Sequence, residues 1–501
     1  MHSSNAAPAT RSAVSQALAR DRVGVAAVWS FIMSGIAPLT VAAGVITSAY
    51  ATTGLTGIPF AFLVIAVVLA LFVPGYMAMT RHITNAGAFY AFIARGLGKP
   101  LGVAAALMAL LAYSFLQVGL YGAFGPAAQG EAQVHLHLSA PWWGWALVGW
   151  AVVTVLGLLR VDITGKVLGV LTTLELVVII IEIIAGLARP AGGHLSLTPL
   201  SPGSLGSAGW STFGVLAVVA GLGFVGFEQA PVLAEETRHP RRTIPAATYL
   251  ALAVIAVVYA GAAWAMAAHA GQSHVIADAA SQGPALMFGM GGTTLAGVAQ
   301  FLFMTSLFAA LLAFHNACWR YCFALSRERV LPAFLSRTGA NSVPKAASLT
   351  QSLTGLLVIV VYAAGGWQPM TDLFFWLGTT GGFGILILLA LTSAAVIGFF
   401  RAGDGERSGE TAWARTIAPT LSAVCLVVIV ILAVQHYGTL LGVAPGSPAA
   451  WLLPASFAAV AVTGLAWALF LRFRLPGIYA TIGLGPAAVT GQTGPASRIS
   501  S

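Results

Sequence analysis

Long apolar runs, separated by short polar connections, recur along the whole chain. A membrane-spanning helix needs about 20 consecutive apolar residues, and twelve runs approach or exceed this length. They cover the ranges 23–50, 59–80, 101–124, 142–159, 167–187, 211–234, 246–267, 293–318, 346–363, 374–400, 416–434 and 451–470. The pattern predicts an all-α integral membrane protein with twelve transmembrane helices.

The basic residues are sorted to one face of this predicted topology. With twelve spans drawn, 22 of the 23 Lys and Arg residues fall in connections or tails of one face, and Arg189 alone falls on the other. Basic residues stay on the cytoplasmic side during insertion. We therefore expect a multi-pass protein of the plasma membrane, the inner membrane of the cell. Residues 1–20 and 475–501 would be its cytoplasmic tails.

The composition agrees with a membrane protein. Hydrophobic residues make up 58% of the chain and charged residues 7%, whereas soluble domains carry about 25% charged residues. The net charge of +9 reflects basic residues that set the topology and face anionic lipid headgroups. No nucleic-acid partner is therefore predicted, and the partners expected are the lipid bilayer and a small-molecule substrate.

Two of the predicted helices carry interruptions near their middle. The first contains Ser34-Gly-Ile-Ala-Pro38, and the sixth contains three glycines between Gly221 and Gly226, followed by Glu228. Glycine is flexible and proline removes an amide donor, so both helices are expected to break. Each could instead be a kink packed against its neighbours. Because they lie at corresponding positions of two five-helix halves, the pair favours a transporter site between inverted repeats.

Three groups of motifs resemble those of a known family, in the expected order. The first group is Asn85-Ala-Gly-Ala-Phe-Tyr90 with Gly96-Leu-Gly98. The second is Gly223-Phe-Val-Gly-Phe-Glu228 with Ala234-Glu-Glu-Thr-Arg-His-Pro240 and Ile244-Pro245. The third is Arg320 to Pro332 with Val343-Pro344 and Ala346. Residues from roughly 20 to 475 resemble the amino acid–polyamine–organocation (APC) superfamily. The resemblance implies the leucine-transporter fold. Helices 1–5 (residues 21–190) and 6–10 (205–400) would form the inverted repeats, with two extra helices in 416–471.

The resemblance also implies where substrate binds. It places contacts at the two breaks, namely at Ser34, Gly35, Ile36, Ala37 and Pro38, and at Phe224, Gly226 and Phe227. Free amides at a break favour a carboxylate, and free carbonyls favour an ammonium group or a cation. A zwitterionic amino acid suits such a site, with Phe224 as an aromatic lid. The alternative for Phe224 is ordinary core packing.

The first break departs from the pattern of many amino acid carriers of this superfamily. Those carriers show Gly-Ser-Gly or a similar triplet, whose amides hold the substrate carboxylate. Here Ser34-Gly35 is followed by Ile-Ala-Pro, and Pro38 has no amide to donate. Either the amides of residues 35–37 hold the carboxylate, or the substrate is an amine without one.

Three carboxylates lie within the predicted spans: Glu175, Glu182 and Glu228. A charged group at mid-membrane costs about 2.5–3.5 kcal/mol on insertion scales, so each is a functional candidate. Proton-coupled relatives carry a lysine on helix 5, and by position Glu175 takes its place. Burial favours the protonated form of a carboxyl group, so Glu175 could bind and release a proton, or it could be structural. Glu182 is expected to be structural or paired with Arg189, and Glu228 to act as gate or scaffold.

The eighth helix carries Thr305 and Ser306, which match the place that completes a sodium site in sodium-coupled members of the fold. Hydroxyl oxygens suit a hard cation, although Ser and Thr inside helices usually bond to their own helix. The coupling ion is therefore a proton or, at Thr305 and Ser306, sodium. No cofactor is expected.

These observations predict a secondary active transporter that imports an amino acid or related amine by alternating access and is driven by protons. Sodium coupling and exchange are alternatives within the same fold. An enzyme is not expected, because the sequence contains no metalloprotease, nucleophile-elbow or nucleotide-binding motif with its required partners. A non-transporting nutrient receptor is the alternative of another class.

Overall fold

The computed structural model describes residues 24–83, 88–159, 161–233, 237–338, 343–404, 409–444 and 446–485. Some sequence predictions fall outside these residues. They concern the tail 1–20, the part of the C-terminal tail after residue 485, the Glu235-Glu236 pair, the start of the Asn85 motif, and Arg11, Arg20, Arg22, Arg160, Arg407 and Arg498.

The regular elements of the described residues are helices. In chain order they are α1 (Val25–Ile36), η1 (Thr40–Val45), α2 (Ile46–Thr53), α3 (Ile58–His82), α4 (Ala88–Gly96), α5 (Lys99–Leu136), α6 (Trp142–Gly157), α7 (Val161–Ala188), η2 (Thr198–Leu200), η3 (Pro202–Ala208), α8 (Gly209–Gly223), η4 (Phe227–Leu233), α9 (Pro240–Ala270), α10 (Val275–Gln282), α11 (Ala285–Phe288), α12 (Thr293–Arg327), η5 (Ala333–Ser336), α13 (Lys345–Gly365), η6 (Pro369–Phe375), α14 (Trp376–Phe399), η7 (Phe400–Asp404), η8 (Trp413–Ile417), α15 (Ala418–Gln435), α16 (Tyr437–Leu441), α17 (Ala449–Arg474) and α18 (Pro476–Thr481). Among them, η1, η6, η7 and η8 are π-helical and η2 to η5 are 3-10 helices.

Ten helical stretches within the described residues are long and apolar enough to cross a membrane. Two shorter apolar helices, Trp142–Gly157 and Leu216–Pro231, lie where the sequence predicts the fourth and sixth spans. Large apolar side chains such as Val67, Val257 and Phe473 are exposed on the outer surfaces of long helices. Exposed apolar surface of this kind suits a lipid solvent, and the fold is that of a multi-pass membrane protein.

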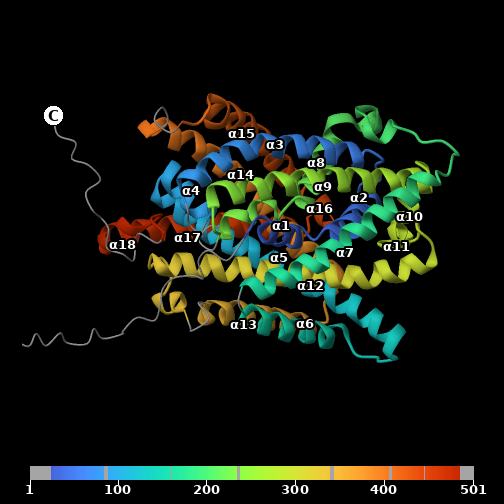
Figure 1. The fold of residues 1–501 in the computed structure, drawn as a ribbon, viewed down its shortest axis with the longest axis horizontal. Helices are drawn as coiled ribbons and strands as arrows, with labels where there is room; N and C mark the ends of the chain where they lie inside the picture. The colour runs from blue at the N-terminus through green and yellow to red at the C-terminus, as the bar shows by residue number, and fades with distance from the viewer. Residues whose placement is uncertain are drawn as a thin grey trace, which may run out of the picture.

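The long helices lie side by side along one direction (Figure 1). Helix α18 lies at one end of the bundle, and α10 and α11 lie at the other. The first helix is central, because α1 packs against α7, α9, α12 and η4. Helix α5 packs against α12, α14 and α17, and α13 packs against α6 and α12. The two interrupted helices therefore meet inside the bundle.

The C-terminal tail predicted from residue 475 begins with a folded segment. Helix α18 follows α17 directly, and the Gly483 and Gly485 amides donate to the buried Glu328 carboxylate at 2.6 and 2.7 Å. The Lys99 ammonium group donates to the last carbonyls of this helix, those of Tyr479 and Ala480. Cations suit the C-terminal end of a helix. The sequence missed this docking because its anchors lie far away in the chain.

A close approach between α5 and η6 sets one wall of the bundle interior. A Cβ atom added at Gly122 would lie 2.4 Å from the Pro369 carbonyl oxygen and 2.8 Å from the Phe374 nitrogen. Real Cβ atoms do not approach backbone so closely, so only glycine lets η6 lie against α5 here. Phe374 is among the residues that line the central pocket described below.

We expect Gly122→Ala to destabilise the protein by about 1–3 kcal/mol, because the added methyl group has no room and must displace η6. The matched control is Gly130→Ala on the same helix, where a Cβ would meet nothing within 4 Å. Thermal unfolding of the purified protein in detergent is the measurement. A melting temperature of the Gly122 variant equal to that of the control would contradict the packing described.

Candidate functional site

The first transmembrane helix is interrupted at Ala37. Helix α1 ends at Ile36, Ala37 has a left-handed backbone with φ 51°, and a new helical stretch begins at Pro38. Pro38 has no amide, so the first free donors of the second half are the amides of Leu39 and Thr40. These would otherwise be unsatisfied at the start of a helix.

Side chains from two other helices satisfy those amides. The Leu39 amide donates to the Glu175 carboxylate of α7 at 3.4 Å, and the Thr40 amide donates to the Ser306 hydroxyl of α12 at 3.3 Å. The Thr40 hydroxyl also donates to Ser306 at 3.2 Å, and Ser306 donates to Glu175 at 2.7 Å. Glu175 is thus a carboxylate at the positive end of a half-helix. We call Thr40, Ser306 and Glu175 the coupling cluster.

Glu175 is almost fully buried, and its second carboxylate oxygen, Oε1, has no hydrogen-bond partner among the described residues. Buried polar atoms are nearly always paired. An unpaired carboxylate oxygen at this depth is therefore suited to carrying a proton or contacting a cation.

The sixth span is interrupted after Gly223. Helix α8 ends there, residues 224–226 form a turn, and the 3-10 helix η4 begins at Phe227. Gly226 has φ 117°, which L side chains rarely adopt, and a Cβ built on it would lie 2.8 Å from the Gly35 carbonyl carbon and the Ile36 nitrogen. The two breaks therefore pack backbone against backbone, and a larger residue at 226 would push them apart.

Glu228 stabilises the backbone conformation of the second break. Its carboxylate accepts a hydrogen bond from the Gly226 amide at 2.8 Å and from the Tyr113 hydroxyl at 3.0 Å. Its own carbonyl accepts a bond from the Tyr76 hydroxyl at 2.7 Å. Glu228 thus ties η4 to α3 and α5, while its role as gate or scaffold stays a prediction.

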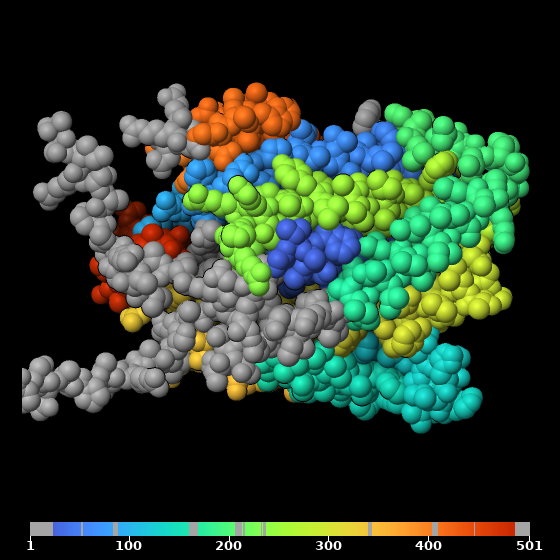
Figure 2. Space-filling view, in the orientation of Figure 1, coloured from blue at the N-terminus to red at the C-terminus, as the bar shows by residue number. Residues whose placement is uncertain are grey.

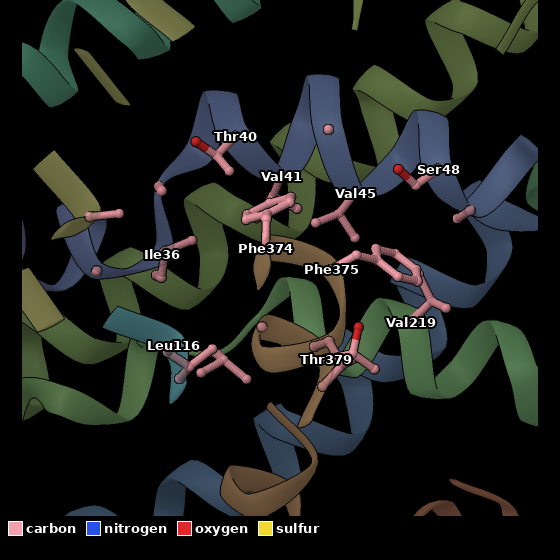
Figure 3. Close-up of a pocket in the computed structure, with 18 of the residues that line it drawn as sticks. Ile36, Thr40, Val41, Val45, Ser48, Leu116, Val219, Phe374, Phe375 and Thr379 are labelled. Atoms are coloured by element: carbon pink, nitrogen blue, oxygen red, sulfur yellow. The ribbon is translucent and has the colours of Figure 1, made fainter. Parts of the chain in front are cut away.

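A central pocket of about 120 Å³ lies beside the first break (Figure 3). Its walls come from α1, η1 and α2, from α5, α8 and α12, and from η6, α14 and α16. The lining residues are Gly35, Ile36, Ala37, Thr40, Val41, Gly44, Val45, Ser48, Ala49, Leu116, Val219, Leu222, Val225, Ala310, Phe314, Phe374, Phe375, Gly378, Thr379 and Leu440. Among these described residues none has an ionisable side chain, and the side-chain polar groups are the hydroxyls of Thr40, Ser48 and Thr379.

Half-buried lining residues gather mainly at the end of the pocket away from the break. Ile36 and Thr40 are almost fully buried, whereas Val45, Ser48 and Phe375 are half-buried. Figure 3 shows Ile36 at one side of the pocket and Ser48 and Phe375 at the other. The pocket therefore opens toward the end of the bundle that lies beyond α2.

The structure brings together only part of the predicted substrate site. Gly35, Ile36 and Ala37 line the pocket, whereas Ser34 and Pro38 do not. The Ser34 hydroxyl instead bonds to the Ser30 carbonyl and to the Thr172 hydroxyl.

The predicted residues of the sixth span lie beside the pocket rather than in its lining. Phe224 is fully buried and packs against Phe62 and Tyr259, with ring centroids 5.9 and 5.7 Å apart. Phe227 packs against Phe72, and Gly226 lies against the first break. The lid role of Phe224 stays a prediction.

The predicted coupling residues separate into two groups. Ser306 joins Glu175, as described above, while the Thr305 hydroxyl donates to the Leu302 carbonyl of its own helix at 2.8 Å. Glu182 accepts a bond from the Gly291 amide at 2.7 Å and, within the described residues, makes no ion pair with Arg189. The structural alternative given for Glu182 fits this arrangement.

Sequence reasoning missed the wall that faces the first helix. Phe374 and Phe375 of η6, and Thr379 of α14, line the pocket opposite Val41 and Val45. Apolar residues within a predicted span carry no sign of whether they face a pocket, a neighbour or lipid. Thr379 offered a weak signal, because its hydroxyl shares the predicted span with those of Thr380, Thr392 and Ser393.

Comparison with known proteins finds transporters. The family model described as amino acid permease matches residues 27–474. The chain is 24% identical over 317 residues to the branched-chain amino acid permease BcaP of Lactococcus lactis, covering 60% of this chain and 68% of the relative. It is 28% identical over 248 residues to uncharacterized transporters of Mycobacterium tuberculosis and Mycobacterium bovis, covering 49% of this chain and 54% of each. The chain therefore spans about half the length of these mycobacterial relatives.

The shape of the pocket predicts different reactivities for cysteines placed at its two ends. We expect Ser48→Cys to react with a bulky hydrophilic maleimide roughly tenfold faster than Thr40→Cys, because cysteine reactivity follows exposure. Native Cys318 and Cys322 are buried and Cys425 is partly exposed, so both variants are made with Cys425→Ser, and this single variant supplies the background. Equal rates at the two positions would contradict a pocket that opens beyond α2.

Proposed function

The chain belongs to the amino acid permease family, and on this premise we propose that it imports an amino acid with an apolar side chain by proton-coupled alternating access. Family membership makes it a multi-pass membrane transporter of the APC superfamily and not an enzyme. The single observation that carries the finer proposal is the coupling cluster, which joins a pocket-lining hydroxyl to a buried carboxylate through Ser306.

We propose twelve spans, made of the ten long helices and the two shorter ones, in a five-plus-five inverted repeat with two further helices. The repeats would comprise residues 21–190 and 205–400, and the further helices residues 416–471. The breaks at Ala37 and after Gly223, in the first and sixth spans, support this arrangement. The one-sided distribution of basic residues supports cytoplasmic termini in the plasma membrane. The pocket would then open to the outside.

The pocket lining supports an apolar substrate side chain. A charged side chain would meet no counter-charge among the described lining residues, and burying an unpaired charge is costly. The relative from Lactococcus is named a branched-chain amino acid permease, which agrees with an apolar lining. At the end of α1 the carbonyls of Gly35 and Ile36, two residues that line the pocket, lie beyond the last helical hydrogen bonds and favour the substrate ammonium group.

The substrate carboxylate and Glu175 would compete for the same donors. The Thr40 hydroxyl lines the pocket, and the amides of Leu39 and Thr40 begin the second half-helix. While Glu175 is ionised, it and Ser306 occupy these donors. Once Glu175 is protonated it accepts hydrogen bonds more weakly, so the donors become available to a second carboxylate. Proton binding would thereby favour amino acid binding, and each would raise the affinity for the other.

Sodium is the alternative coupling ion. Ser306 and the Glu175 carboxylate offer oxygen ligands that suit a hard cation, but the hydroxyl of Thr305 is bonded within its own helix. The arrangement therefore favours the proton. Two other functions are possible for this fold: exchange without net uptake, and binding without transport by a receptor. The following experiment distinguishes them.

We expect purified protein in proteoliposomes to accumulate labelled leucine or a similar apolar amino acid when a proton gradient is imposed, and not when a sodium gradient is imposed alone. Glu175→Gln keeps the size of the side chain but cannot carry the proton, so gradient-driven uptake should fall by about 10²-fold or more. Glu182→Gln, on the same helix, is the matched control and should retain uptake.

Each other outcome of this experiment would replace the proposal. Uptake driven by sodium alone would move the coupling to a cation at Ser306. Exchange of internal for external substrate without accumulation would indicate an exchanger, and binding without flux would indicate a receptor. Uptake of amines but not of amino acids would exclude the carboxylate competition described above.

Pocket size should set which side chains are accepted. Ala310 of α12 is fully buried and lines the pocket, so Ala310→Val adds two methyl groups to the wall. We expect uptake of leucine to fall by roughly tenfold relative to uptake of alanine, because overpacking a filled pocket costs about 1–3 kcal/mol. The ratio of the two substrates within one variant is independent of expression and folding. An unchanged ratio would mean that substrate binds elsewhere.

A further inference from the structure

Three contacts connect the first transmembrane segment, which comprises α1 and the stretch after its break, with α7 at successive levels. At the first, a Cβ atom built on Gly169 would lie 3.0 Å from the Ser30 hydroxyl. At the second, the hydroxyls of Ser34 and Thr172 are 2.9 Å apart. At the third, the Leu39 amide donates to Glu175. Hydroxyl groups thus line the path along this interface that ends at Glu175.

The helical spacing explains why these groups align. Ser30 and Ser34 are four residues apart on α1, and Thr172 and Glu175 are three residues apart on α7, so each pair shares one helix face. Ser34 and Thr172 are almost fully buried, and Ser30 is 8% exposed. The path therefore leads from the interior toward the start of α1.

The start of α1 lies at the surface. Val25 is exposed, and Figure 2 shows this part of the first helix, in dark blue, between the yellow-green of α9 and the green of α7. In the proposed topology this end is cytoplasmic, because it follows the basic N-terminal residues.

We propose that the hydroxyls of Thr172 and Ser34 form a proton relay between Glu175 and the cytoplasmic end of α1. This proposal rests on the proposed proton coupling and names the route by which Glu175 discharges. It goes beyond identifying Glu175 as the coupler, because it assigns two further positioning residues.

The transfer balances without any additional reactant. A proton leaves the Glu175 carboxyl group and is accepted by the Thr172 hydroxyl, directly or through one water. Thr172 gives its own proton to Ser34, and Ser34 gives its proton to water at the level of Ser30. Glu175 becomes ionised, both hydroxyls are restored, and they turn back before the next cycle. In the observed state Ser34 donates to the Ser30 carbonyl at 2.7 Å, so Thr172 is the donor to Ser34. This orientation already points toward the cytoplasmic end.

Other titratable groups near Glu175 lie off this route. Tyr259 on α9 is close enough to Glu175 to interact with it electrostatically, and Glu182, two turns along α7, is held by the Gly291 amide. On α12 the group facing Glu175 is the Ser306 hydroxyl. Among the hydrogen bonds of the described residues, neither Tyr259 nor Glu182 bonds to Ser34 or Thr172. The two hydroxyls therefore form a separate connection.

The test compares two neighbouring threonines of α7. Thr172 is fully buried and bonded to Ser34, while Thr173 is exposed and bonds to the Gly169 carbonyl of its own helix at 2.8 Å. We measure net leucine uptake driven by a proton gradient and, separately, exchange of labelled for unlabelled leucine. Exchange lets substrate and proton return together, so it does not require proton release to the cytoplasmic side.

We expect Thr172→Val and Ser34→Ala to lower net uptake by about tenfold or more while exchange is retained, and Thr173→Val to change neither. Thr172→Ser, which keeps the hydroxyl group, should restore net uptake. Equal net uptake by the Thr172 and Thr173 valine variants would overturn the relay, as would a parallel loss of uptake and exchange that serine does not restore. A wild type without proton-driven uptake would overturn the proposed function itself, so the two failures are distinguishable.

Discussion

The need to satisfy backbone amides inside a membrane is the constraint on which this structure depends. No water is available in the hydrocarbon region, so a helix can break there only if other groups receive the freed donors. At the first break Pro38 removes one donor, and Glu175 and Ser306 receive the next two. The positions of α7 and α12 beside α1 follow from this requirement, and the pocket exists because the helix path opens at Ala37.

The two breaks meet the same constraint in different ways. Glu228 bonds to an amide two residues earlier in its own chain, and tyrosines from α3 and α5 hold it in place. Glu175 instead reaches across from another helix, and its second oxygen has no hydrogen-bond partner in the part of the chain that the structure describes. A local bond moves with its own segment, whereas a bond between helices is made or lost when those helices shift. This asymmetry explains why, of the two glutamates that bond to the breaks, we assign coupling to Glu175 and scaffolding to Glu228.

More of the fold than of the candidate site could be predicted from the sequence. Apolar runs predicted the helices, and Ser34 to Pro38 and Gly221 to Gly226 predicted both interruptions, since glycine and proline act locally on the backbone. The pocket walls were not predictable, because Phe375 or Leu116 in an apolar span looks the same whether it faces a cavity or a neighbour. The contacts of Phe224 with Phe62 and Tyr259 could not be predicted either, because these residues lie on three different segments far apart in the chain. The docking of α18 depends on Glu328 and Lys99, whose separation from it in sequence hid the contact.

The departure from the usual glycine-rich triplet at the first break changes which backbone amides are available to the substrate. With Pro38 in place, the amides available near the pocket shift forward to Leu39 and Thr40, and these are the amides that Glu175 and Ser306 hold. A substrate carboxylate that uses them must displace an ionised carboxylate from a half-helix N-terminus, which both electrostatics and hydrogen bonding oppose. Neutralising Glu175 removes that opposition. In this chain, therefore, the residue that removes an amide from the binding site also makes binding depend on the charge of the coupling carboxylate.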